Sequence, residues 1–97
     1  CIALRADIDA LPIQEASGLP FASKKAGIAH CCGHDLHMTA LLYAAKLLKK
    51  AENDITGRVL LIFQPAEEKL NGSKSVIDTG IFEKYHPQFI IGLHTWP

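Results

Sequence analysis

The chain has 97 residues, 48% of them hydrophobic and 21% charged, which is the composition of a folded protein and excludes a disordered or low-complexity segment. Ten Lys and Arg balance ten Asp and Glu, so the neutral chain lacks the positive charge that binding to nucleic acid or to an anionic membrane requires. The longest apolar stretches, residues 38–45 and 59–63, are far shorter than the roughly 20 residues that cross a bilayer.

A chain of this length supports one hydrophobic core and therefore one domain at most. It opens on the apolar run Cys1-Ile2-Ala3-Leu4 and ends shortly after another apolar run, with no cap or signal-peptide pattern at the start. Both ends are typical of cuts through strands, so we expect residues 1–97 to be part of a longer protein.

Three cysteines, two of them adjacent, do not form a disulfide framework. Cys31 and Cys32 lie among histidines and a carboxylate, which favours metal or thiolate chemistry in a reducing compartment. The expected location is therefore cytoplasmic.

Hydrophobic patterning predicts alternating strands and helices. A strand over residues 1–5 leads to Asp7 and Asp9, and residues 10–33, rich in Gly and Pro, form a long loop over a site. A mostly buried helix over residues 35–50 follows. The next strand, over 59–63, is apolar without alternation, as expected of a central strand covered on both faces. A short helix over 73–78 stops at Gly80, with Ile81 and Phe82 as apolar anchors, before a strand over 89–93. This order predicts an α/β fold with a largely parallel sheet, helices packed on it and right-handed crossovers.

Side chains that bind metals follow every predicted strand. Asp7 and Asp9 follow the first, Glu67 and Glu68 the second, and His94 the third. The carboxyl ends of parallel strands share one edge, so these groups should converge there. The start of the long helix adds six further potential ligands, namely His30, Cys31, Cys32, His34, Asp35 and His37. Histidine, cysteine and carboxylate together favour a zinc-like ion over magnesium or calcium.

Other interpretations of these residues remain open. The segment from His30 to Asp35 could be a polar helix start with buried cysteines, a structural zinc site, or a catalytic thiol with a histidine base, although a catalytic metal site is favoured. Glu67 and Glu68 alone would be typical of a solvated pair, and His94 alone of a structural histidine. The two aspartates could simply form Asx turns.

Four ordered blocks carry a resemblance to a known family. They are Ala3-Leu4-Arg5-Ala6-Asp7-Ile8-Asp9-Ala10-Leu11-Pro12, His30-Cys31-Cys32-Gly33-His34-Asp35-Leu36-His37, Phe63-Gln64-Pro65-Ala66-Glu67-Glu68 and Gly92-Leu93-His94-Thr95-Trp96-Pro97. Together they resemble the M20 metallopeptidases, and most of all the amidohydrolase branch that contains hippurate hydrolase and N-acyl-amino-acid deacylases. The blocks span nearly the whole chain.

The resemblance implies a role for each matching residue. Cys32, His34, Glu68 and His94 would bind a pair of divalent ions of zinc, manganese, cobalt or nickel, and Glu67 would be the general base. Asp7, Asp9 and Asp35 would orient the ligands. The implied activity is hydrolysis of the amide bond of an N-acyl amino acid or peptide by a metal-activated water.

The resemblance also implies a fold like the catalytic domain of zinc exopeptidases, of which residues 1–97 are a part. A lid and dimerisation domain, and a last histidine ligand, would then lie outside the chain, and the intact protein would be a homodimer.

The chain departs from the family at several positions. Cys31 stands where the family usually has a small residue, Leu36 where it has glycine, and Lys69-Leu70-Asn71-Gly72 where it has a glycine-rich stretch. Two alternatives to the metal-dependent hydrolase stay open: a non-catalytic fragment of such an enzyme, whose site lacks its last ligand and its lid, and a thiol hydrolase that uses Cys32 and His34.

Overall fold

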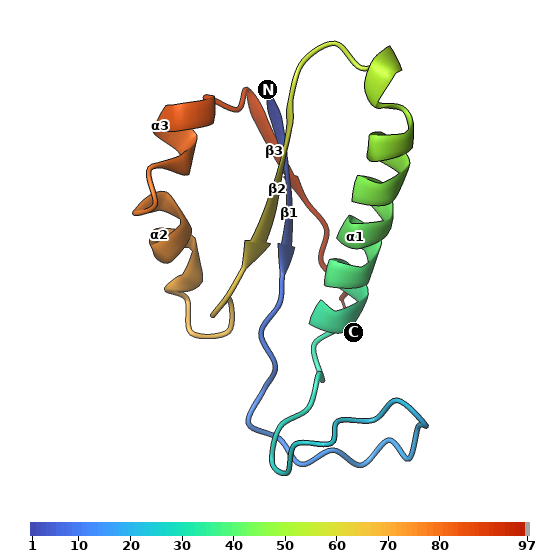
Figure 1. Ribbon diagram of the computed structural model, residues 1–97. Helices are drawn as coiled ribbons and strands as arrows, with labels where there is room; N and C mark the ends of the chain where they lie inside the picture. The colour runs from blue at the N-terminus through green and yellow to red at the C-terminus, as the bar shows by residue number, and fades with distance from the viewer. Residues whose placement is uncertain (97) are drawn as a thin grey trace.

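The computed structural model describes residues 1–96, which form a three-stranded parallel sheet between helices (Figure 1). The strands are β1 (Ile2–Asp7), β2 (Val59–Gln64) and β3 (Phe89–Gly92), in the order β2-β1-β3. Ile2 at the start of β1 pairs with Val59 on one side and with Phe89 on the other. The predicted parallel sheet is confirmed, and all three strands end at the same edge.

Helices lie on both faces of the sheet (Figure 1). One face carries α1 (His34–Lys50), which is followed by a short 3₁₀ turn, η1 (Glu52–Asp54), and the other carries α2 (Gly72–Ile77) and α3 (Ile81–Tyr85). Asp35 in the first turn of α1 and Lys49 and Lys50 in its last turn complement the helix dipole. The predicted helices agree with α1 and α2 to about a residue at each end, whereas α3 was expected only as apolar anchors, because five residues are too few to display helical periodicity.

Two expectations about burial are wrong. The long helix was expected to be mostly buried, but in α1 the buried residues are His34, His37 and Leu41, while Leu36 and Leu47 are each 62% exposed. The strand over 59–63 was expected to be central, but β1 takes the centre and β2 lies at an edge. Within residues 1–96, no further layer covers the outer face of α1, and no strand flanks β2 on the side away from β1.

Buried polar side chains are as prominent as the apolar core. The buried apolar residues are small or few, namely Ala3, Ala6, Ala29, Leu41 and Ile62. The largest fully buried side chains are instead His34 and Asp7, with His37 and Gln64 also buried. Burying polar groups is unfavourable unless they have partners, so this concentration points to a site built for chemistry.

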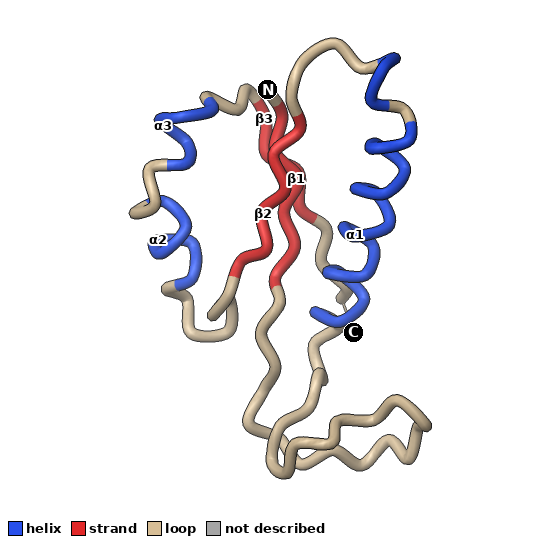
Figure 2. Tube along the Cα trace, viewed as in Figure 1, coloured by secondary structure: helices blue, strands red, loops and turns tan. Residues whose placement is uncertain are grey.

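The segment between β1 and α1 forms an extended arm beyond the carboxyl ends of the strands (Figure 2). An antiparallel bridge between Leu11 and Ala29 joins its two sides. The predicted loop is confirmed, but only its two ends, at Asp9 and Cys32, approach the edge of the sheet, while the rest projects away. Among the helices in residues 1–96, none is long and apolar enough to cross a membrane.

Candidate metal centre

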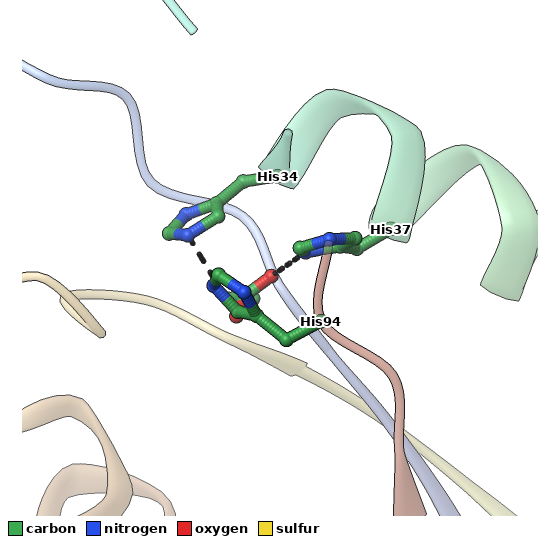
Figure 3. Close-up of side chains that lie close together, drawn as sticks. His34, His37 and His94 are labelled. Atoms are coloured by element: carbon green, nitrogen blue, oxygen red, sulfur yellow. Dashed lines mark hydrogen bonds and ion pairs between the residues drawn. The ribbon is translucent and has the colours of Figure 1, made fainter. Parts of the chain in front are cut away.

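The three parallel strands and the start of α1 bring three imidazoles together (Figure 3). His34 and His37 come from the first turn of α1, and His94 comes from the segment after β3. Their ring centroids lie 5.5 Å apart for His34 and His37, 5.5 Å for His34 and His94, and 4.7 Å for His37 and His94. The rings lie close together but have different neighbours, and these neighbours determine which nitrogen of each ring can bind a metal ion.

His34 has one nitrogen held and one free. Its Nδ1–H donates to the carbonyl oxygen of Asp9 over 2.9 Å, so in the neutral imidazole Nε2 is the nitrogen that can bind a cation. This Nε2 is buried and has no hydrogen-bond partner. Carboxylate oxygens surround it, with Glu67 Oε2 at 3.6 Å, Glu68 Oε1 at 3.8 Å and Asp7 Oδ2 at 3.8 Å. A bare acceptor facing carboxylates is unfavourable by itself and is the arrangement that a cation would satisfy.

His94 presents its ring in the same way. Its Nδ1–H donates to the carbonyl oxygen of Thr95 over 2.6 Å, which leaves Nε2 available. That nitrogen lies 3.8 Å from Cys32 Sγ and 3.9 Å from Asp7 Oδ2. Two imidazole nitrogens and one sulfur therefore face a common space.

Cys32 lies among negative groups. A hydrogen bond with Glu68, partial burial and the nearby charges of Glu68, Glu67 and Asp7 raise the pKa of its thiol. A thiolate at this position therefore needs a positive charge beside it, and a bound metal ion supplies one. Potential ligand atoms of Cys32, His34 and Glu68 all lie within 4.8 Å of one another.

Asp9 fixes the turn that carries the two glutamates. Its carboxylate accepts the backbone N–H of Glu67 and that of Glu68, each over 3.1 Å. Burial would raise the pKa of Asp9, but these bonds outweigh it and lower the pKa, so the carboxylate stays ionised. The turn is tight: Ala66 has a φ of 51°, and a Cβ on Gly72 would lie 1.6 Å from the oxygen of Pro65. Glu67 and Glu68 are thereby aimed at His34.

Asp7 is fully buried and has a partner on each oxygen. Oδ1 accepts the Nδ1–H of His37 over 2.6 Å, and Oδ2 accepts from Arg5 Nη1 over 2.9 Å, while Arg5 Nε donates to Gln64 Oε1 over 2.9 Å. Burial would raise the pKa of Asp7, but the His37 hydrogen bond and the Arg5 charge outweigh it, so the pKa is lowered. Asp7 is thus a fixed negative charge beneath the three imidazoles.

The structure brings most of the candidate residues together. Those near the shared space are Asp7, Asp9, Cys32, His34, Glu67, Glu68 and His94. Asp35 is exposed in the first turn of α1, outside both groups of potential ligands. His30 and Cys31 are exposed as well, and Pro97, at the end of the fourth motif block, lies outside the described residues.

Sequence patterns alone do not identify Arg5 as part of the site, His37 as an orienting group, or Thr95 as a contact of the ligands. A signal existed for the first two. Arg5 precedes Asp7 by two positions and so shares its side of the strand, and His37 follows His34 by three positions and so shares its helix face. For Thr95 the sequence held no signal beyond its place next to His94.

The donor atoms fit divalent metal ions. Potential ligands form two groups that share His34, one with Cys32 and Glu68, the other with Asp7, His37 and His94. Nitrogen, sulfur and carboxylate donors in one place are typical of zinc and of neighbouring transition metals rather than of calcium.

Known proteins have closely similar sequences. The chain is 51% identical over 96 residues to hippurate hydrolase of Campylobacter jejuni and 54% identical over 96 residues to N-acetyl-L-cysteine deacetylase of Bacillus subtilis. These alignments cover 99% of this chain but 24% and 23% of the two relatives. The chain thus spans about a quarter of the length of these curated relatives.

A solved structure has the same fold. The YXEP protein of Bacillus subtilis, a dinuclear metal-binding peptidase from the M20 family, superimposes with a TM-score of 0.91 and 47% sequence identity over 99% of this chain and 26% of its own. The sequence pattern of Peptidase family M20/M25/M40 matches residues 3–97. The match extends over nearly the whole chain, and the fold agrees with it. This chain therefore belongs to Peptidase family M20/M25/M40.

Proposed function

We propose that this chain supplies most of the metal centre of an enzyme that hydrolyses the amide bond of N-acyl amino acids. The observation that carries the proposal is the buried, unpartnered Nε2 of His34, which faces carboxylates, with Cys32 and His94 beside it. The names of the relatives support the substrate class, because hippurate and N-acetyl-L-cysteine are both N-acyl amino acids. The products would be a carboxylic acid and an amino acid.

Four residues would hold a pair of divalent ions: Cys32, His34, Glu68 and His94. The dinuclear peptidase with the same fold supports a pair, and the mixed donor set supports zinc, manganese, cobalt or nickel. Such ions supply a lowered pKa for a water molecule and stabilise negative charge on the substrate carbonyl.

Glu67 would act as the general base. Its carboxylate lies 3.6 Å from His34 Nε2 and its backbone is held by Asp9, so it reaches the same space as the ligands while its side chain stays 30% exposed. It would take a proton from the attacking water and later return this proton to the leaving amine. Glu68, the neighbouring carboxylate, would bind metal instead.

Further proposals concern the setting of the enzyme. The three cysteines are free, which supports a reducing compartment such as the cytoplasm. The relatives are about four times as long as this chain, which supports a closing and dimerisation domain elsewhere in the intact protein.

The substitution Glu67→Gln, made in the intact full-length protein, tests the proposal. This variant keeps the shape of the side chain and removes the base, so we expect hydrolysis of N-acyl amino acids to fall by about 10²–10⁴-fold while metal content is unchanged. Glu83→Gln, at an exposed position on α3, is the matched control and should retain activity. Loss of metal from the Glu67 variant would contradict the assigned roles of Glu67 and Glu68.

Chelation separates the metal-dependent reaction from the alternatives. A thiol hydrolase based on Cys32 and His34 would keep its activity in a chelator, whereas the proposed enzyme would lose it and regain it on adding metal. The raised pKa of the Cys32 thiol also disfavours this residue as a nucleophile. A chain that binds no metal and hydrolyses no N-acyl amino acid would be the non-catalytic alternative.

A further inference from the structure

His37 lies against the proposed ligands, yet its environment differs from theirs. It is buried in the first turn of α1, and both of its ring nitrogens already have partners. We propose that His37 is a positioning residue that links Asp7 to Thr95 and so fixes the orientation of Cys32 and His94. The proposal rests on the proposed metal centre and concerns how that centre is held.

His37 has three hydrogen-bonding contacts, of which those with the Asp7 carboxylate and the Thr95 backbone N–H define its tautomer; the third joins Nε2 to Thr95 Oγ1 over 3.2 Å. The carboxylate of Asp7 can only accept, so His37 Nδ1 carries the proton that is shared over 2.6 Å. The backbone N–H of Thr95 can only donate, and it reaches His37 Nε2 over 2.9 Å, so Nε2 is the acceptor. Asp7 therefore selects the tautomer that can receive Thr95.

Thr95 in turn contacts both neighbouring ligand residues. Its carbonyl oxygen accepts the Nδ1–H of His94, which turns Nε2 of that ring toward Cys32. Its Oγ1 donates to the carbonyl oxygen of Cys32 over 3.1 Å. One backbone position, held by His37, thus fixes a nitrogen donor and the segment that carries the sulfur donor.

Gly33 provides an independent indication that this contact is built into the fold. A Cβ at Gly33 would lie 2.3 Å from Thr95 Oγ1, so Thr95 reaches its place only because residue 33 has no side chain. Gly33 also has a φ of 81° as the N-cap of α1, a conformation that glycine adopts without strain. The turn between Cys32 and His34 is therefore shaped to admit Thr95.

A direct metal role for His37 is the rival interpretation, because His37 belongs to one of the two groups of potential ligands. Coordination through Nε2 would remove the acceptor of the Thr95 N–H, and coordination through Nδ1 would break the bond to Asp7. His34 Nε2 has no hydrogen-bond partner, and His94 Nε2 faces the sulfur of Cys32, itself a proposed ligand, so neither nitrogen is held by a residue outside the proposed ligand set.

Two substitutions separate the nitrogens of His37. In His37→Gln, Oε1 can replace Nε2 as the acceptor for Thr95; in His37→Asn, the amide can still donate to Asp7 but is too short to reach Thr95. Both are compared with the unsubstituted full chain and with His86→Asn, a matched control at an exposed position after α3. Cobalt(II) titration, followed by visible absorption, reports the affinity, the number of ions and the coordination geometry.

We expect His37→Asn to lower cobalt affinity by about 10–100-fold and to change the ligand-field bands, without reducing the number of ions bound at saturation. His37→Gln should restore most of the affinity, and His86→Asn should behave like the unsubstituted chain. Loss of one ion in both His37 variants would overturn the proposal in favour of direct coordination. Unchanged affinity in His37→Asn would overturn the positioning role alone.

A second measurement needs no metal and no variant. Nitrogen-15 NMR of the histidine rings in the metal-free full chain should show His37 as the tautomer with its proton on Nδ1. A proton on Nε2 would overturn the proposal. Failure of the unsubstituted chain to bind cobalt in a defined ratio would overturn the proposed function itself, and the positioning role with it, so the two failures are distinguishable.

Discussion

Adjacent cysteines have different surroundings in this molecule. Cys32 is half-buried, with its sulfur 3.8 Å from His94 Nε2, whereas Cys31 is exposed. We expect Cys32→Ser to weaken metal binding at least about ten-fold, because a hydroxyl is a poorer ligand than a thiolate, and Cys31→Ser to leave it unchanged. Equilibrium dialysis with zinc on the two variants measures this. The opposite result would place the ligand at residue 31.

At the scale of single residues, the sequence predicts the candidate metal ligands better than it predicts the residues that hold those ligands in place. The motif residues and the strand ends identify Cys32, His34, Glu68 and His94 as candidates without a structure. The role of His37 depends on a contact with Thr95, 58 positions away, that no local pattern encodes. Asp35 shows the converse, since it belongs to a motif block but faces solvent.

Among the elements, the arm between β1 and α1 has its own internal support. Glu15 accepts the backbone N–H of Ser17 over 2.8 Å and that of Ser23 over 3.1 Å, and these bonds lower the pKa of its carboxyl from 4.5 to about 2. A lowered pKa means that this support is complete above about pH 4.5 and is lost as the pH falls toward about 2. We expect the amide resonances of Ser17 and Ser23 to shift with a midpoint near the lower value.

Glu15→Gln is the control for this titration, because it removes the ionisable group while keeping the length of the side chain. The amide shifts of Ser17 and Ser23 should then lose their acidic step. A midpoint near 4.5 in the unsubstituted chain would show that the carboxylate does not hold the arm in solution.

The turn after β2 depends on a glycine. Gly72 is buried, its N–H donates to the carbonyl oxygen of Ala66 over 3.1 Å, and an added Cβ would overlap the oxygen of Pro65. We expect Gly72→Ala to lower the free energy of unfolding by about 1–3 kcal/mol, as overpacking does. Ser73→Ala, at the exposed next position, should change it by less than about 0.5 kcal/mol. Urea denaturation measures both, and equal stability of the two variants would contradict the steric argument.

The sequence predicts where the helices and strands begin and end more reliably than it predicts what packs against them. Apolar runs and turn residues located β1, α1, β2, α2 and β3, because periodicity and capping act locally. The run from Val59 to Phe63 predicted a central strand, yet β2 is an edge strand. A continuous apolar run indicates that a strand is suited to burial. It does not indicate which strands and helices within residues 1–96 lie beside it.

In the molecule as a whole, the side of the sheet along β3 is not covered by any other element of residues 1–96. All residues of β3 are exposed, and an apolar cavity of about 500 Å³ lies between α1 and the sheet beside this strand, lined in part by Leu36, Leu41, Ile91 and Leu93. The helices α2 and α3 lie on the opposite face of the sheet from α1 (Figure 1). Exposed parallel edge strands of this kind readily pair with other chains.

We therefore expect the 97-residue chain to self-associate through β3, where Phe89, Ile90 and Ile91 are 67%, 53% and 53% exposed. A lysine on an edge strand opposes pairing through its charge and hydration, so Ile90→Lys should raise the dissociation constant of the assembly by at least about ten-fold, equivalent to about 1.4 kcal/mol. Ile77→Lys, at a 51% exposed position on α2, adds the same charge away from that edge and should have little effect. Sedimentation velocity over a wide range of concentrations distinguishes the two variants. A chain that stays monomeric at every concentration, or equal weakening by both lysines, would show that β3 is not the surface through which the chain associates.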